Sequence, residues 1–220
     1  MSRGLLVLQC TPGTKIQDLG RVGYRRYGVT RSGAMDPVAL QIANCLVGNP
    51  FDTAAIEMNI GGADFRVACE SVRVALHGGD FVLAINGVRA PVSTSLRLRQ
   101  GDIISIGRAR QRIRCYLAIE GGLDIEPTLG SCETHTRAGL GGVNGAALET
   151  GQELELLNTK APLRKEFSLP YSAFPHPRRQ FRVVLGPQAH RFTADGIQTL
   201  LPSAAFRIDK DSDSVGYRLT

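Results

Sequence analysis

The chain has 220 residues, of which 43% are hydrophobic and 21% charged, and this composition excludes a disordered or collagen-like chain. Its formal net charge of +6 permits an anionic partner but does not require one. The N-terminal apolar run, residues 4–10, is too short for a signal peptide or a membrane span, so the sequence predicts a cytoplasmic protein with no membrane partner.

Five cysteines are present, and no two of them stand in a C-x-x-C pair. The odd number and the spacing indicate neither a disulfide framework nor a zinc site. We expect buried, reduced thiols, which suit a reducing compartment.

Residues 4–10, GLLVLQC, predict a first strand, and residues 11–35 predict a long, turn-rich loop. From residue 53 to residue 157 the pattern is typical of β structure. Gly-Gly-Asp, Asn-Gly and Gln-Gly-Asp turns separate short apolar runs there, which favours an antiparallel barrel or sandwich. The runs are AAIEMNI, FRVAC, VRVALHG, FVLAING, DIISIG, RIRCYLAIEGG and QELELL.

The one strong helical pattern of the first half covers residues 37–47. Asp36 is a suitable N-cap, Pro37 suits the first helical position, and Gly48 is a typical C-terminal residue. Apolar side chains recur at i, i+3, i+4 and i+7, which gives the helix one apolar face. They are Ala39, Ile42, Ala43 and Leu46.

Residues 158–180 contain four prolines and no periodicity, so they are predicted to be a linker. Beyond it, residues 181–188 predict a strand, 194–201 a helix and 204–208 another strand. Residues 181–220 are too few to bury a core of their own. We expect them to be the beginning of a second domain that this sequence does not complete.

Several landmarks in a fixed order resemble one known family. They are Gln17, Asp18, Gly20, Arg21 and Gly23, then Gly28-Val29, then Ser32 to Asp36 (SGAMD), then Ala43 to Asn49 (ANCLVGN). The blocks LAIEGGLDIEPTLGSCETHTRAGLGG, VVLGPQ and GYRL follow. Together they resemble the C subunit of bacterial 5-oxoprolinase, also called the KipA-like or allophanate hydrolase subunit 2 family, which is related to the carboxyltransferase part of urea carboxylase.

The resemblance implies a mainly β fold with few helices (α+β). A cyclophilin-like β-barrel domain over residues 1–157 would precede the start of a second, incomplete β-barrel domain over residues 181–220. It also implies a subunit of an ATP-dependent enzyme that opens 5-oxoproline to glutamate together with a KipI-like B subunit and an A subunit. ATP would be bound by this chain or by a partner subunit.

Two other functions stay open at this stage. A biotin-dependent carboxyltransferase component would need biotin on a carrier, and this chain has no Met-Lys carrier motif. A non-catalytic regulatory binding subunit is the third hypothesis, because no hydrolase triad, nucleophile elbow or Walker A motif is present. The four histidines lack metal-ligand spacing, so we expect no metal site.

Asp36, Arg21 and Asp18 are the candidate catalytic residues. The planar guanidinium of Arg21 suits a carboxylate or phosphate, and Asp18 can orient it. The alternative is an ion pair that only holds the turn. For Asp36 the alternative to catalysis is a purely structural helix cap. Both roles are compatible only if one carboxylate oxygen caps the helix and the other faces a site, where it could act as a general base.

The sequence RAGLGG, residues 137–142, is a candidate anion-binding loop. Backbone N–H groups of Gly139, Gly141 and Gly142 could converge on a phosphate or carboxylate, with charge from Arg137. The alternative is a barrel-corner loop whose glycines allow tight bends. We hypothesise a concave site for an anionic or amide substrate, lined by Arg21, Asp36 and Arg137.

Asn44 and Gln188 are further substrate-binding candidates. Asn44 lies beside the apolar face of the helix. Gln188 and His190 follow a predicted strand, where a surface turn is the alternative. Tyr217 and Arg218 are substrate-binding candidates only through the resemblance.

Four arginines alternate along RARQRIR and are predicted to line one face of a single strand. A solvated sheet face, a subunit interface and a nucleic-acid surface are the alternatives. No aromatic residues interleave with them, so we expect no nucleic-acid partner. These arginines are Arg108, Arg110, Arg112 and Arg114.

Overall fold

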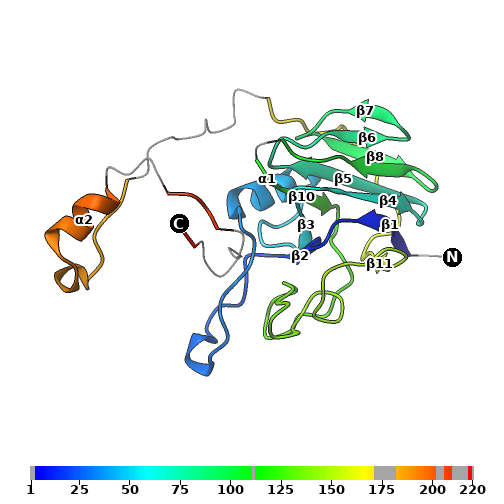
Figure 1. The fold of residues 1–220 in the computed structure, drawn as a ribbon. Helices are drawn as coiled ribbons and strands as arrows, with labels where there is room; N and C mark the ends of the chain where they lie inside the picture. Colours follow the sequence, from blue (N-terminus) through cyan, green and yellow to red (C-terminus); the bar gives the residue numbers. More distant parts are fainter. Residues whose placement is uncertain (1–2, 111, 171–181, 202–205, 210–217, 220) are drawn as a thin grey trace. The chain divides into compact units, whose positions relative to one another are not determined.

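The computed structural model describes residues 3–110, 112–170, 182–201, 206–209 and 218–219 (Figure 1). The chain divides into two compact units, Met1–Pro170 and Tyr171–Thr220. The described residues form eleven strands and two α-helices, so the prediction of a mainly β fold is confirmed.

The first unit contains two antiparallel sheets. The six-stranded sheet has the order β11-β1-β4-β9-β6-β7, and the five-stranded sheet has the order β2-β3-β10-β5-β8. No strand pairing joins one sheet to the other within the described residues, so the sheets are open rather than closed into the predicted barrel. The strands of the first sheet are β1 (Gly4–Cys10), β4 (Ala63–Val67), β6 (Leu83–Ile85), β7 (Val88–Ala90), β9 (Ile103–Ile106) and β11 (Glu153–Glu155). Those of the second are β2 (Lys15–Gln17), β3 (Ala55–Asn59), β5 (Ser71–His77), β8 (Ser95–Arg99) and β10 (Arg114–Ile119).

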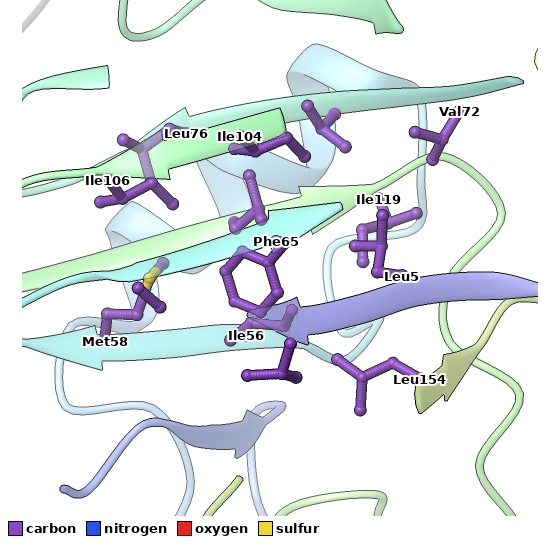
Figure 2. Packing of buried hydrophobic residues seen from close by; sticks show 14 of the residues in the cluster. Leu5, Ile56, Met58, Phe65, Val72, Leu76, Ile104, Ile106, Ile119 and Leu154 are labelled. Atoms are coloured by element: carbon purple, nitrogen blue, oxygen red, sulfur yellow. The ribbon is translucent and has the colours of Figure 1, made fainter. Parts of the chain in front are cut away.

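The hydrophobic core lies between the two sheets (Figure 2). Leu5, Phe65 and Ile104 come from the six-stranded sheet and are fully buried. Ile56 and Leu76 of the five-stranded sheet pack into the same cluster. Because side chains alternate along a strand, the residues between these core positions point to the opposite face of each sheet.

The opposite face of the five-stranded sheet carries helix α1 (Pro37–Val47). Small side chains, Ala55, Ala75 and Ala118, let the helix approach closely, and Leu40 and Ala43 are completely buried against them. The helix has the predicted bounds. Its ends have the predicted caps, since the Ala39 N–H donates to Asp36 Oδ1 at 3.0 Å and Gly48 has a φ of 79°.

The prediction that four arginines line a single strand is wrong. Residues 108–110, 112 and 113 are irregular, and residue 111 lies outside the described residues. Of the four arginines, only Arg114 is in β10. The side chain of Asp80 causes this, because its Oδ1 accepts the N–H groups of Arg110 at 3.0 Å and Arg112 at 3.1 Å. Those N–H groups are therefore bound in a turn instead of a sheet ladder.

Residues 158–170, predicted as the first part of the linker, belong to the first unit. The buried guanidinium of Arg73 donates to Glu120 and Glu166 at 2.8 Å each, and to the carbonyl of Pro162 at 3.1 Å. The Ala161 N–H also donates to the Ser71 carbonyl. We call residues 160–168 the strap. Residues 171–180 of the predicted linker lie outside the described residues.

The second unit contains a 3₁₀ turn, η3 (Ala189–Arg191), and helix α2 (Ala194–Leu200), where a helix was predicted. The described residues 182–188 form no strand, contrary to the prediction for 181–188. Ile208 pairs with Leu219 in a single antiparallel bridge. A second barrel therefore stays a prediction.

All five cysteines are thiols without a disulfide. Cys69 and Cys115 are buried as expected, whereas Cys45 is exposed because it lies on the outer side of α1. No helix in the described parts of the chain has the length and apolar character needed to cross a membrane.

Replacing Arg73 with methionine should lower the free energy of unfolding by about 3 kcal/mol, because Glu120 and Glu166 would lose their buried partner. Urea denaturation measures this change. Arg99→Met, at an exposed position of the same sheet, is the matched control and should change stability little. Equal effects of the two variants would contradict a role for Arg73 in holding the strap.

Candidate functional site

Three polar side chains form a row across the sheet face that carries α1. Tyr116 on β10 pairs directly with Glu57 on β3 and with His77 on β5. All three are buried, and they lie at the end of the sheet where α1 begins. The row is the polar edge of an otherwise apolar helix-binding face.

Glu57 and Tyr116 fix the backbone at the start of the helix. The Tyr116 hydroxyl donates to Glu57 Oε2 at 2.7 Å and accepts the N–H of Asp36 at 2.8 Å. The N–H of Met35 donates to the same Oε2 at 3.1 Å. Desolvation and the nearby Glu57 carboxylate raise the pKa of Tyr116, so the hydroxyl keeps its proton at neutral pH.

The second oxygen of Glu57 has no hydrogen-bond partner among the described residues although it is buried. The nearest cation is Arg114, whose Nη1 lies 3.9 Å from Oε1. A buried carboxylate oxygen without a donor is costly, and such groups occur at sites that bind something.

His77 completes the row as a neutral imidazole. Its Nδ1 lies 2.9 Å from Ser93 Oγ, and only 6% of the residue is exposed. Desolvation lowers the pKa of His77 to about 4, although the carboxylate of Asp36 acts in the opposite direction. At neutral pH this side chain can therefore exchange hydrogen bonds but carries no charge.

Asp36 caps α1 as predicted, whereas its role in a ligand site stays a prediction. Oδ1 accepts the N–H of Ala39, and the residue is exposed. Among the described residues, no hydrogen bond reaches Oδ2. One oxygen thus caps the helix, and the other can meet a ligand at the helix mouth.

The contacts of Arg21 do not support the interpretation that its guanidinium receives a substrate. The side chain is buried and pairs with the Glu133 carboxylate. It also donates to the carbonyls of Thr128 at 3.1 Å and Glu133 at 2.7 Å. Asp18 does not pair with Arg21 but accepts from the Ser131 hydroxyl and the Cys132 N–H, both at 2.7 Å. These residues tie loop 17–21 to loop 128–133.

The glycine loop, residues 137–142, packs against the contacts that join residues 17–21 to residues 128–133. A Cβ at Gly141 would come within 2.2 Å of Arg21 Nη2, and one at Gly142 within 1.9 Å of Thr134 Oγ1. The N–H groups of Ala138, Leu140 and Gly142 donate to carbonyls of His135 and Cys132. Three of the loop's six backbone N–H groups, including that of Gly142, are therefore bound within the protein. An anion cradle formed by Gly139 and Gly141 stays a prediction.

The remaining candidates do not gather at the helix mouth. Asn44 is buried and donates to the Thr53 carbonyl at 2.7 Å, and it accepts from the Asn49 side chain at 3.2 Å. It therefore holds the end of α1. Gln188 is exposed in the second unit, where it precedes η3.

Arg137 is exposed in the glycine loop, and the Arg218 carbonyl accepts the N–H of Asp209 at 2.8 Å within the second unit. Tyr217 lies outside the described residues. In the described parts of the chain, no three His, Cys, Asp or Glu side chains gather to hold a metal ion.

Sequence reasoning missed Glu57, Tyr116 and His77. The signal was present, because each stands next to core residues in an apolar strand, as in Ile56-Glu57-Met58. Alternation assigns them to the non-core face, but only the strand register places them side by side.

The model of the carboxyltransferase domain, subdomain A and B, matches residues 27–220. The chain belongs to this family. The C subunit of 5-oxoprolinase from Escherichia coli is 28% identical over 98% of this chain and 68% of its own length. The urea amidolyase of Saccharomyces cerevisiae is 34% identical over 94% of this chain but only 12% of its own length.

Similarity to solved structures supports the same family assignment. The crystal structure of Kluyveromyces lactis urea carboxylase matches 100% of this chain with a TM-score of 0.90 at 29% identity, over 20% of its own length. The chain thus spans a small part of the urea-handling relatives and about two thirds of the 5-oxoprolinase relative. The family resemblance seen in the sequence is confirmed.

The low pKa of His77 predicts pH-dependent stability in this carboxyltransferase domain. The unfolded chain takes up a proton at His77 near pH 6.5, whereas the folded protein resists protonation down to about pH 4. Stability is therefore complete above pH 6.5 and is lost as the pH falls towards 4, by about 2 kcal/mol between pH 7 and pH 5. Urea denaturation of the wild type and of His77→Gln at both pH values tests this. The variant should lose that part of the pH dependence, and an unchanged pH dependence would contradict the assignment.

Arg21→Met should lower the free energy of unfolding by about 4 kcal/mol, because Glu133 would be left as an unpaired buried carboxylate. Arg25→Met, four residues further along and exposed, is the matched control. Thermal and urea unfolding measure both variants. A stable Arg21→Met protein that has lost only ligand binding would restore the interpretation of Arg21 as a substrate residue.

Proposed function

We propose that this chain is part of an enzyme subunit that binds a small amide at the mouth of α1 and moves a proton at the amide nitrogen. The proposal rests on the Asp36 carboxylate, whose two oxygens have different contacts. Its Oδ1 caps the helix, and its backbone N–H is held by Tyr116, which in turn rests on Glu57. The position of the carboxylate is thus fixed from two sides, while among the described residues no hydrogen bond reaches Oδ2 of this exposed residue.

The proposed chemistry needs one well-placed proton acceptor. Opening a cyclic amide requires a proton on the departing nitrogen, and carboxylating an amide requires removal of a proton from it. Asp36 can supply either transfer as a general acid or base. His77 and the Tyr116 hydroxyl are buried and uncharged, so they keep the sheet face beside the helix mouth polar without adding charge.

We propose 5-oxoproline opening as the reaction, with a KipI-like B subunit and an A subunit as partners and with ATP bound by one of these subunits. Similarity to the C subunit of 5-oxoprolinase over nearly the whole chain supports this proposal. A cytoplasmic location belongs to the same proposal.

A biotin-dependent carboxyltransferase component is the second candidate. It is favoured by the description of the matching family and by the 34% identity to a urea amidolyase. Asp36 would take part in both reactions, but in opposite directions: as a general acid it would donate a proton to the departing nitrogen in ring opening, and as a general base it would accept one from the amide nitrogen in carboxylation. A regulatory subunit without catalysis is the third candidate.

Asp36→Asn tests the proton transfer, because asparagine caps a helix about as well as aspartate but is a poor base. Stability should change by less than about 0.5 kcal/mol. Turnover in the full-length protein assembled with its partner subunits should fall by at least about 100-fold. Glutamate formation from 5-oxoproline and ATP is the assay, and urea carboxylation with a biotin carrier is run beside it.

Asp36→Ala is the companion variant and should lose about 1 kcal/mol of stability with the cap. Full turnover by Asp36→Asn would exclude Asp36 as the proton-transfer residue. A wild-type assembly that turns over neither substrate would contradict the catalytic proposals and favour the regulatory one.

A further inference from the structure

Residues 19–33 form a basic arm that extends from the first unit beyond β2 (Figure 1). Arg25, Arg26 and Arg31 are exposed on it. No aspartate or glutamate occurs between residues 19 and 35, so the arm carries unopposed positive charge within its own sequence. None of these arginines takes part in the site at the mouth of α1.

The arm is held in one conformation. At its base, the Arg21 N–H donates to the Arg31 carbonyl at 2.8 Å and the Ala34 N–H to the Asp18 carbonyl at 2.9 Å. At the tip, the 3₁₀ turn η1 (Arg25–Tyr27) closes with a bond from the Tyr27 N–H to the Tyr24 carbonyl. A preorganised segment loses little conformational entropy when it binds a partner.

A cleft of about 810 Å³ lies along the inner side of the arm. Val22, Tyr24 and Arg31 of the arm form one wall. The rest of the lining is mostly apolar or glycine and includes Leu123, Ile125, Pro127 and Leu129. Val22 is 71% exposed and lines the cleft, so its side chain is accessible to an apolar group of a partner.

The composition of this surface favours a protein over a nucleic acid. Tyrosine and arginine beside an apolar hollow are typical of protein interfaces. The Arg26 guanidinium lies 4.7 Å from the centre of the Tyr27 ring and covers one of its faces, so that face cannot stack on a base. Asp18 and Asp52 also line the cleft, so the hollow itself suits an apolar side chain better than any anionic group, and a partner's carboxylates are expected only at the arginines of the arm.

We propose that the basic arm and its cleft form a docking surface for a partner protein that presents an acidic segment next to an apolar side chain. The carboxylates of that segment meet Arg25, Arg26 and Arg31. The apolar side chain enters the cleft beside Val22. This surface is separate from the Asp36 site, so the proposal does not depend on the reaction proposed above.

The test uses a fluorescent synthetic peptide in which a run of glutamates precedes a leucine and a phenylalanine, with binding to the full chain measured by anisotropy. Saturable binding is expected, and it should weaken as salt is added. Arg25→Glu/Arg26→Glu should weaken it by at least about tenfold. Val22→Asp should also weaken it, because an exposed carboxylate at the cleft mouth opposes both the charge and the apolar contact. Val22, Arg25 and Arg26 are all exposed, so these substitutions remove no buried side chain.

Arg89→Glu/Arg99→Glu, which changes charge equally at two exposed arginines outside the arm, is the matched control and should bind as the wild type does. Replacing the leucine and phenylalanine of the peptide with serine should weaken binding if the cleft is used. No saturable binding, equal loss in the control variant, or tighter binding of an oligothymidine than of the peptide would each overturn the proposal.

Discussion

The hydroxyl of Tyr116 is the contact on which the candidate site depends. It joins the sheet to the start of α1, because it donates to Glu57 and accepts from the backbone of Asp36. Without this bond, the N–H of Asp36 would lose its partner, and Oε2 of the buried Glu57 would keep only the N–H of Met35. The same contact fixes where the Asp36 carboxylate stands, so helix capping and the presentation of a ligand-binding oxygen have one physical cause.

The rest of the helix-bearing face follows from strand alternation. Polar Glu57, Tyr116 and His77 form its first row, and alanines form the second, where α1 packs. Beyond the alanines, Arg73 meets Glu120 and the strap. Successive rows on one sheet face thus provide polar groups at the start of α1, the alanine surface on which α1 packs, and the ion pairs that hold the strap.

The two fully buried arginines form their contacts within the chain. Arg21 and Arg73 each tie together segments far apart in the sequence, by pairing with acids and donating to carbonyls. Arginine suits this task because it offers five donors in a planar arrangement and stays charged when buried. The positive charge that faces solvent therefore lies on exposed side chains, and part of it is on the basic arm.

The sequence by itself determined α1, its caps and most of the long strands, because capping residues and hydrophobic periodicity act within a few residues. It also determined the family, through motifs whose order does not depend on three-dimensional contacts. Only the tertiary structure decided that Glu57, Tyr116 and His77 stand in one row, since strand register depends on packing between distant segments. It likewise decided that Arg21 pairs with Glu133 instead of a ligand, because that partner lies 112 positions away along the chain and no local pattern connects the two.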